Sequence, residues 1–200
     1  RLTLLDDQGM VFDFSNVKRT IKRVIDERVD HRLVIPRAYK GLEWNEDEPD
    51  SFTWRLTDGT QILHRSPDEA VVWLSSDRVV PSAVARLLEQ ELRAVLPANV
   101  TNVDIALRED VIEGAYYHYV HGLKKHMGNC QRIAHGHRSP IRIDRNEHRD
   151  RDLENQWAKR WQDIYVGSEE DVTQRWVAED GTAYVTFEYE ANQGEFALTL

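Results

Sequence analysis

Two stretches of the N-terminal half carry apolar residues at helical spacing. The first follows Ser15, whose side chain can cap a helix, and the second follows Pro81-Ser82 and stops before Pro97. The pattern predicts an amphipathic helix in each stretch. The first helix has four apolar residues on one face: Val17, Ile21, Val24 and Ile25.

Alternation of apolar and polar residues predicts strands elsewhere. Residues 51–65 alternate on both sides of Asp58-Gly59, which is typical of a β-hairpin, and residues 71–74 add a short strand. Residues 103–107 and 115–120 are expected to form two long antiparallel strands. Further strands are expected over 141–143 and 196–200, and a second hairpin is expected around Asp180-Gly181, between residues 174–178 and 183–190. Residues 144–163 are highly charged, and the apolar residues Leu153, Trp157, Trp161 and Ile164 follow a helical spacing. Helices and antiparallel strands are segregated along the chain, which indicates the α+β class.

Composition narrows the functional classes. The chain has 200 residues, enough for one large domain or two small ones, and its net charge of −9 disfavours binding to nucleic acid or to acidic lipid. No apolar run approaches the ~20 residues of a membrane helix. The single cysteine, Cys130, indicates a reducing compartment, and we expect a cytoplasmic protein. Because the chain begins at Arg1 and ends within an alternating run, we expect it to be a fragment cut at both ends.

The densest group of reactive side chains lies between residues 121 and 137. His135 and His137 are two residues apart, so on a strand they project from the same face and can bind one metal ion, and His121 can join them from the preceding strand. Three imidazoles with an open fourth position are the arrangement of a catalytic zinc site. The alternative interpretation is a set of surface histidines in a basic loop.

The group resembles the zinc motif of the 6-pyruvoyltetrahydropterin synthase and 6-carboxytetrahydropterin synthase family. In that family, a histidine of one strand and a His-Gly-His on the next bind zinc, and a cysteine ahead of the His-Gly-His is the catalytic base. Here these positions are His121, His135, His137 and Cys130. Other stretches resemble the family in order along the chain: Gly9–Phe14 with Val17-Lys18, Val29–Leu33, Val80–Ala83 and Arg108-Glu109.

The order of these motifs differs from that of the family, in which the zinc strands come first. The resemblance therefore implies a tandem protein, with residues 1–113 forming the C-terminal part of one tunnelling-fold unit and residues 114–200 the N-terminal part of a second. The alternative is a circular permutation. The tunnelling fold implies an antiparallel sheet with two helices packed on one face. Its units assemble into a barrel, so we expect a homo-oligomer.

The resemblance also implies a reaction. Family members act on 7,8-dihydroneopterin triphosphate, so the expected activity is that of a zinc-dependent lyase on this substrate. The product we favour is 6-carboxytetrahydropterin, of the queuosine pathway, with loss of triphosphate and acetaldehyde. Cys130 would be the base, His31 oriented by Asp30 would relay the proton, and Glu109 would hold the pterin ring.

Two alternatives remain open at this point. The first is formation of 6-pyruvoyltetrahydropterin by elimination of triphosphate. The second is a tunnelling-fold protein that binds zinc without catalysis. The second draws on the spacing of Cys130: four residues separate it from His135, where bacterial members of the family usually have three.

Overall fold

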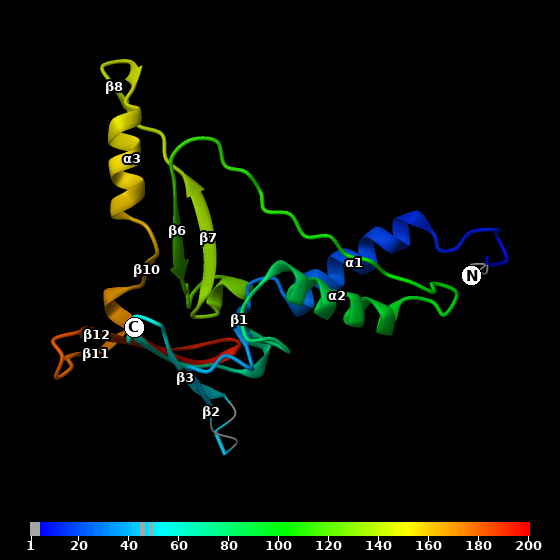
Figure 1. Cartoon of the computed structure of the whole chain (residues 1–200), viewed down its shortest axis with the longest axis horizontal. Helices are drawn as coiled ribbons and strands as arrows, with labels where there is room; N and C mark the ends of the chain where they lie inside the picture. The colour runs from blue at the N-terminus through cyan, green and yellow to red at the C-terminus, as the bar shows by residue number, and fades with distance from the viewer. Residues whose placement is uncertain (1–4, 45–46, 49) are drawn as a thin grey trace. The chain divides into compact units, whose positions relative to one another are not determined.

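The computed structural model describes residues 5–44, 47–48 and 50–200, which form two compact units. Unit 1 comprises the chain up to Lys40 together with Val71–Glu109. Unit 2 comprises Gly41–Ala70 and Asp110–Leu200. Figure 1 labels the helices and strands of both units.

Unit 1 contains the two predicted amphipathic helices, α1 (Phe14–Arg28) and α2 (Pro81–Val95). The cap of α1 is Asp13, whose carboxylate accepts a hydrogen bond from the Asn16 N–H at 2.9 Å, so the prediction of Ser15 as the cap is wrong. The apolar faces of the helices meet in a core of buried side chains: Val24, Leu88 and Leu92.

A pair of parallel strands completes the regular structure of unit 1. Strand β1 (Leu33–Pro36) pairs with β5 (Val71–Leu74), which confirms the strand predicted over 71–74. Buried Val72 and Leu74 pack against Ala83 of α2, so the helix covers the strand that precedes it. This packing buries an apolar strand without an alternating polar face, as is usual for parallel pairs.

The predicted strand over residues 103–107 is absent, because these residues have no ladder of backbone hydrogen bonds. Val103 and Ile105 instead pack against the α1–α2 core, and the Ile105 N–H donates to the Glu89 side chain at 3.0 Å. The alternating apolar residues of this segment thus form a face that packs against α1 and α2. Glu109, at the end of this segment, is exposed.

Unit 2 contains a six-stranded antiparallel sheet in the order β11-β12-β13-β4-β3-β2. The predicted hairpins over 51–65 and 174–190 and the C-terminal strand are confirmed. The pairing of β13 with β4 joins chain segments that are more than 100 residues apart. The strands are β2 (Leu42–Trp44), β3 (Ser51–Arg55), β4 (Gln61–Arg65), β11 (Val172–Val177), β12 (Ala183–Ala191) and β13 (Gly194–Thr199).

A second sheet of unit 2 has three strands in the order β10-β6-β7. Strand β6 (Tyr116–His121) confirms the tyrosine-rich strand and runs antiparallel to β7 (His135–Pro140), as Figure 1 shows. Strand β10 (Ile164–Val166) pairs with β6 in parallel. Single turns of 3₁₀ helix lie at Asp68–Ala70, Asn129–Gln131 and Glu169–Asp171.

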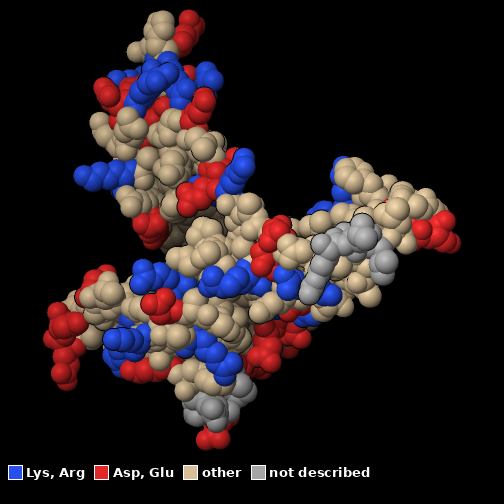
Figure 2. Space-filling model, turned by 45° about the vertical axis from the view of Figure 1, so that its right-hand side comes forward, with Lys and Arg blue, Asp and Glu red and all other residues tan. Residues whose placement is uncertain are grey.

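The strand predicted over residues 141–143 is wrong. The Ile143 N–H donates instead to Glu154 at 3.0 Å, and two short strands follow, β8 (Asp144–Arg145) and β9 (His148–Arg149). Helix α3 (Arg151–Arg160) confirms the helical pattern within 144–163, although Ile164 belongs to β10. Acidic and basic side chains are intermixed over α3 and the β8–β9 hairpin at the top of Figure 2. Many of them are paired, as in Arg142–Asp144, Arg145–Asp150 and Arg149–Glu154.

The architecture confirms the α+β class, with three α-helices and mainly antiparallel sheets among the described residues. One boundary between the compact units, after Glu109, lies near the predicted division at residue 113, but residues 41–70 belong to unit 2. The tandem organisation stays a prediction. Among the helices of the described ranges, none is both long and apolar enough to cross a bilayer.

Candidate metal centre

The β6–β7 hairpin brings the three predicted zinc ligands together. In its register His121 lies opposite His135, and Tyr119 lies opposite His137. Since side chains two residues apart on a strand share a face, all three imidazoles project from the same face of the hairpin. His121 and His135 are buried, and His137 is half-buried. The position of each ring therefore follows from the backbone pairing.

The three imidazoles are close enough to bind one ion. One ring nitrogen from each histidine lies within 4.8 Å of the other two, and the ring centroids are 4.3–5.0 Å apart. Such nitrogens share a point no farther than about 2.8 Å from each, whereas zinc binds nitrogen at about 2.0–2.1 Å. A shift of each ring by less than about 1 Å closes the difference, so the residues fit a zinc ion.

A backbone carbonyl orients one of the rings. His135 Nδ1 lies 3.1 Å from the carbonyl oxygen of Arg132, which can only accept a hydrogen bond. Nδ1 therefore carries the proton, and the lone pair is on Nε2. Metal-binding histidines are commonly held in this way through the nitrogen that does not bind the ion.

An aromatic side chain supports the other two rings. Tyr119 stacks on His137 at 5.2 Å and on His121 at 5.7 Å, with interplanar angles of 21° and 19°. Tyr119 also stacks on Tyr117, and Trp161 contacts Tyr117 edge-on. Tyr119 is not among the site residues predicted from the sequence. Residues 117, 119 and 121 share one phase of the strand alternation, however, and this signal places them on one face.

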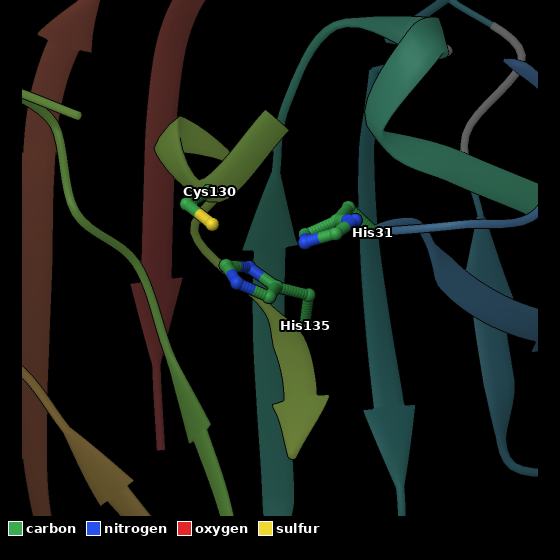
Figure 3. Close-up of side chains that lie close together, drawn as sticks. All are labelled: His31, Cys130 and His135. Atoms are coloured by element: carbon green, nitrogen blue, oxygen red, sulfur yellow. The ribbon is translucent and has the colours of Figure 1, made fainter. Parts of the chain in front are cut away.

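Cys130 lies in the 3₁₀ turn Asn129–Gln131, just before the segment that leads into β7. Its thiol is half-buried and points toward the His135 ring (Figure 3). Cys130 Sγ and a ring nitrogen of His135 lie within 4.8 Å of each other. The structure therefore brings the only cysteine of the chain close to one of the three histidines.

A cavity of about 530 Å³ adjoins the end of β6. It is lined by residues 122–126, which directly follow His121, and by residues 166–168 and 170–171. Its two lysines face carboxylates: Lys124 forms an ion pair with buried Asp171, and Lys125 lies 3.9 Å from Glu170. The hydrogen bond to Asp171 raises the pKa of Lys124 above its usual value, so this lysine stays cationic.

Asp30 and His31 belong to unit 1, between the end of α1 and β1. The Asp30 carboxylate lies 2.8 Å from His31 Nδ1, so the predicted pair is formed. His31 has a φ of +56°, in the left-handed region that few residues other than glycine adopt. Backbone strain of this kind clusters at functional sites, and here it also turns the chain from the helix into the strand.

Glu109, the predicted pterin ligand, is the last residue of unit 1 and is exposed. It does not follow a strand, since residues 101–113 have no regular structure. The geometry of unit 1 thus leaves its carboxylate accessible, and its role stays a prediction.

Comparison with known proteins gives partial structural matches. No protein-family model matches the chain, and no curated protein matches it. The crystal structure of 6-pyruvoyl tetrahydropterin synthase from Plasmodium vivax is similar over 46% of this chain and 54% of the synthase, with 20% identity and a TM-score of 0.37. The synthase of Plasmodium falciparum matches over 44% and 52%, with 19% identity and a TM-score of 0.36. The chain thus spans about half the length of the solved structures it matches.

Proposed function

We propose that this chain is part of a zinc-dependent lyase acting on 7,8-dihydroneopterin triphosphate. The observation that carries the proposal is the cluster of His121, His135 and His137 on one face of a hairpin, with the only thiol of the chain next to it. Three imidazoles leave a coordination position open, whereas structural zinc sites use four protein ligands. A zinc ion bound there would supply Lewis-acid polarisation of a substrate oxygen.

The chain's own residues would handle the protons. Cys130, as the thiolate, would accept a proton from the carbon of the substrate's side chain that bears a hydroxyl group. We propose His31 as the second acid–base group, because Asp30 holds its Nδ1 and thereby fixes the orientation and tautomer of the imidazole. This composite use of the two units is a prediction from the family resemblance, as is the homo-oligomer.

The cavity next to β6 has room for a small molecule, since ligand sites commonly measure about 300–1,000 Å³. Lys124 and Lys125 would need to exchange Asp171 and Glu170 for phosphate oxygens in order to bind the triphosphate. Glu109 would bind the pterin ring through paired hydrogen bonds to its N–H groups.

Product analysis tests the proposal. Zinc-loaded full-length protein is incubated with 7,8-dihydroneopterin triphosphate and the products are separated. 6-Carboxytetrahydropterin together with acetaldehyde supports the activity we favour, and 6-pyruvoyltetrahydropterin supports the alternative lyase. If neither product forms, the lyase proposal is contradicted and a non-catalytic zinc protein is favoured.

A cysteine variant separates the roles of thiol and metal. We expect Cys130→Ala to lower turnover by about 10²–10⁴, the typical contribution of a general base, while zinc content stays the same. Metal analysis of the purified variant provides the control. Loss of zinc together with activity would make Cys130 a fourth ligand, and unchanged turnover would transfer the base role to another residue.

A further inference from the structure

The segment that joins Cys130 to His135 lies outside the strands of the described residues, yet hydrogen bonds hold it in place. Four consecutive carbonyl groups, from Cys130 to Ile133, each accept a hydrogen bond from a different donor. The Cys130 carbonyl accepts from the Leu123 N–H at 2.8 Å, and the Arg132 carbonyl accepts from His135 Nδ1. The other two donors are tyrosine hydroxyls from strands distant in sequence.

These two hydroxyls approach from β10 and β12. Tyr189 Oη donates to the Gln131 carbonyl at 2.6 Å, and Tyr165 Oη donates to the Ile133 carbonyl at 3.0 Å. Burial raises the pKa of both tyrosines well above the usual value, so the hydroxyls keep their protons near neutral pH. Gly122 makes room for this contact, since a Cβ there would overlap Tyr189 Oη and lie 2.8 Å from Ile133 Cα.

Gln193, in the turn between β12 and β13, holds the same segment through side chains. Its Nε2 donates to Asn129 Oδ1 at 2.8 Å, and its Oε1 accepts from Arg132 Nε at 3.2 Å. Arg132, Ile133 and Ala134 are buried. Buried carbonyl groups that accept hydrogen bonds make a backbone segment rigid, because a movement of the segment would break those bonds.

We propose that Tyr189, assisted by Tyr165 and Gln193, is a positioning residue that sets the Cys130 thiol and the His135 imidazole relative to each other. Tyr189 belongs to the six-stranded sheet, whereas Cys130 and His135 lie outside it. Through Tyr189, this sheet therefore helps to position two residues that belong to other elements. The inference takes from the proposed function only that His135 binds the metal and that Cys130 is reactive. Tyr189 itself touches neither substrate nor ion in this role, and it acts through the Gln131 carbonyl.

The test uses Tyr189→Phe, which removes the hydroxyl and keeps the ring. Tyr184→Phe is the matched control, since Tyr184 is a buried tyrosine of the same strand and its ring stacks on Trp176. Because Cys130 is the only cysteine, its alkylation by iodoacetamide reports this site alone. The second readout is titration with Co²⁺ and Zn²⁺, followed by the visible cobalt spectrum and by competition with a chelator.

We expect Tyr189→Phe to weaken zinc binding about tenfold and to change the cobalt spectrum, as loss of supporting contacts around metal ligands does. Alkylation of the metal-free protein should accelerate about fivefold or more, because the segment opens more often. Tyr184→Phe should leave both quantities within about twofold of wild type. Equal alkylation and zinc binding in wild type and Tyr189→Phe would overturn the inference.

Two further outcomes are decisive. Should Tyr189→Phe not fold, Gln193→Ala takes its place, with the same expected directions and with unchanged values again overturning the inference. Should the wild type bind neither Co²⁺ nor Zn²⁺, the proposed function fails. The alkylation rates then still decide whether Tyr189 positions Cys130.

Discussion

The hairpin at residues 116–140 and the segment at residues 101–113 have similar sequence patterns and different structures. Both contain alternating apolar residues, and strands were predicted in both. Residues 116–121 pair with residues 135–140, so alternation becomes a strand whose one face carries the histidines. Val103 and Ile105 turn their alternating face to the α1–α2 core, and residues 101–113 pair with no strand.

The comparison shows that alternation selects a face, whereas a partner for the backbone decides whether a strand forms. The consequence for the site is direct. The register of the hairpin places its imidazoles, whereas Glu109 lies exposed in a segment that has no strand register.

Removal of one ligand from the paired hairpin should have the largest effect. We expect His137→Ala to weaken zinc binding by about 10²–10³, because each ligand of a four-ligand zinc site accounts for roughly a quarter of about 10–16 kcal/mol, and the loss of one of three ligands should cost a similar amount. Zinc titration with a competing chelator measures it. His118→Ala is the matched control, since this exposed histidine is on the neighbouring strand and projects from its opposite face. Equal losses in both variants would show that register does not select the ligands.

A fully paired strand also buries a histidine in the six-stranded sheet. His64 of β4 stacks on Phe52, and burial lowers the pKa of His64 to about 4 from an ordinary value of 6.5. The unfolded chain binds the proton first as pH falls, so the contribution to stability is complete above pH 6.5 and is lost toward pH 4. The free energy of unfolding should drop by about 3 kcal/mol over that range.

Denaturant unfolding at several pH values measures the loss. His64→Phe keeps an aromatic ring beside Phe52 and cannot titrate, so the difference between variant and wild type isolates the His64 share. Identical pH dependence in the two proteins would contradict the assignment.

The unpaired segment provides the third prediction. If Glu109 binds the pterin, Glu109→Gln should weaken neopterin binding roughly ten- to a hundredfold, because each lost charge-assisted hydrogen bond costs about 1.5–3 kcal/mol. Glu113→Gln, four residues further along the exposed segment, is the control. Equal neopterin affinities for wild type and Glu109→Gln would remove Glu109 from the site.

The smallest effect concerns the attachment of that segment to the helices. Glu89→Gln weakens the hydrogen bond that the Ile105 N–H donates, and we expect a loss of about 1 kcal/mol in unfolding free energy. Amide exchange at Ile105 should accelerate in the variant. Unchanged exchange at this amide would show that the Glu89 contact does not hold the segment.

Much of this protein follows from local sequence. The helical period at residues 17–25 and after Pro81 located α1 and α2, and Asp58-Gly59 and Asp180-Gly181 located two hairpins, because these signals depend on neighbours along the chain. The His-x-His spacing was equally local: two strand residues of one phase share a face, whatever the rest of the chain does.

Tertiary structure decided what depends on distant partners. The strand predicted over residues 103–107 does not form, because Val103 and Ile105 pack against the helices. The strand predicted over residues 141–143 does not form either, because the Ile143 N–H donates to the buried Glu154 carboxylate. Tyr165 and Tyr189 lie on strands 30 to 60 residues from the segment before His135, and their hydroxyls donate to its carbonyl groups. No local sequence pattern predicts hydrogen bonds between such distant residues. Spacing thus determined which side chains could bind a metal, whereas long-range burial and hydrogen bonding determined how firmly their backbone is held.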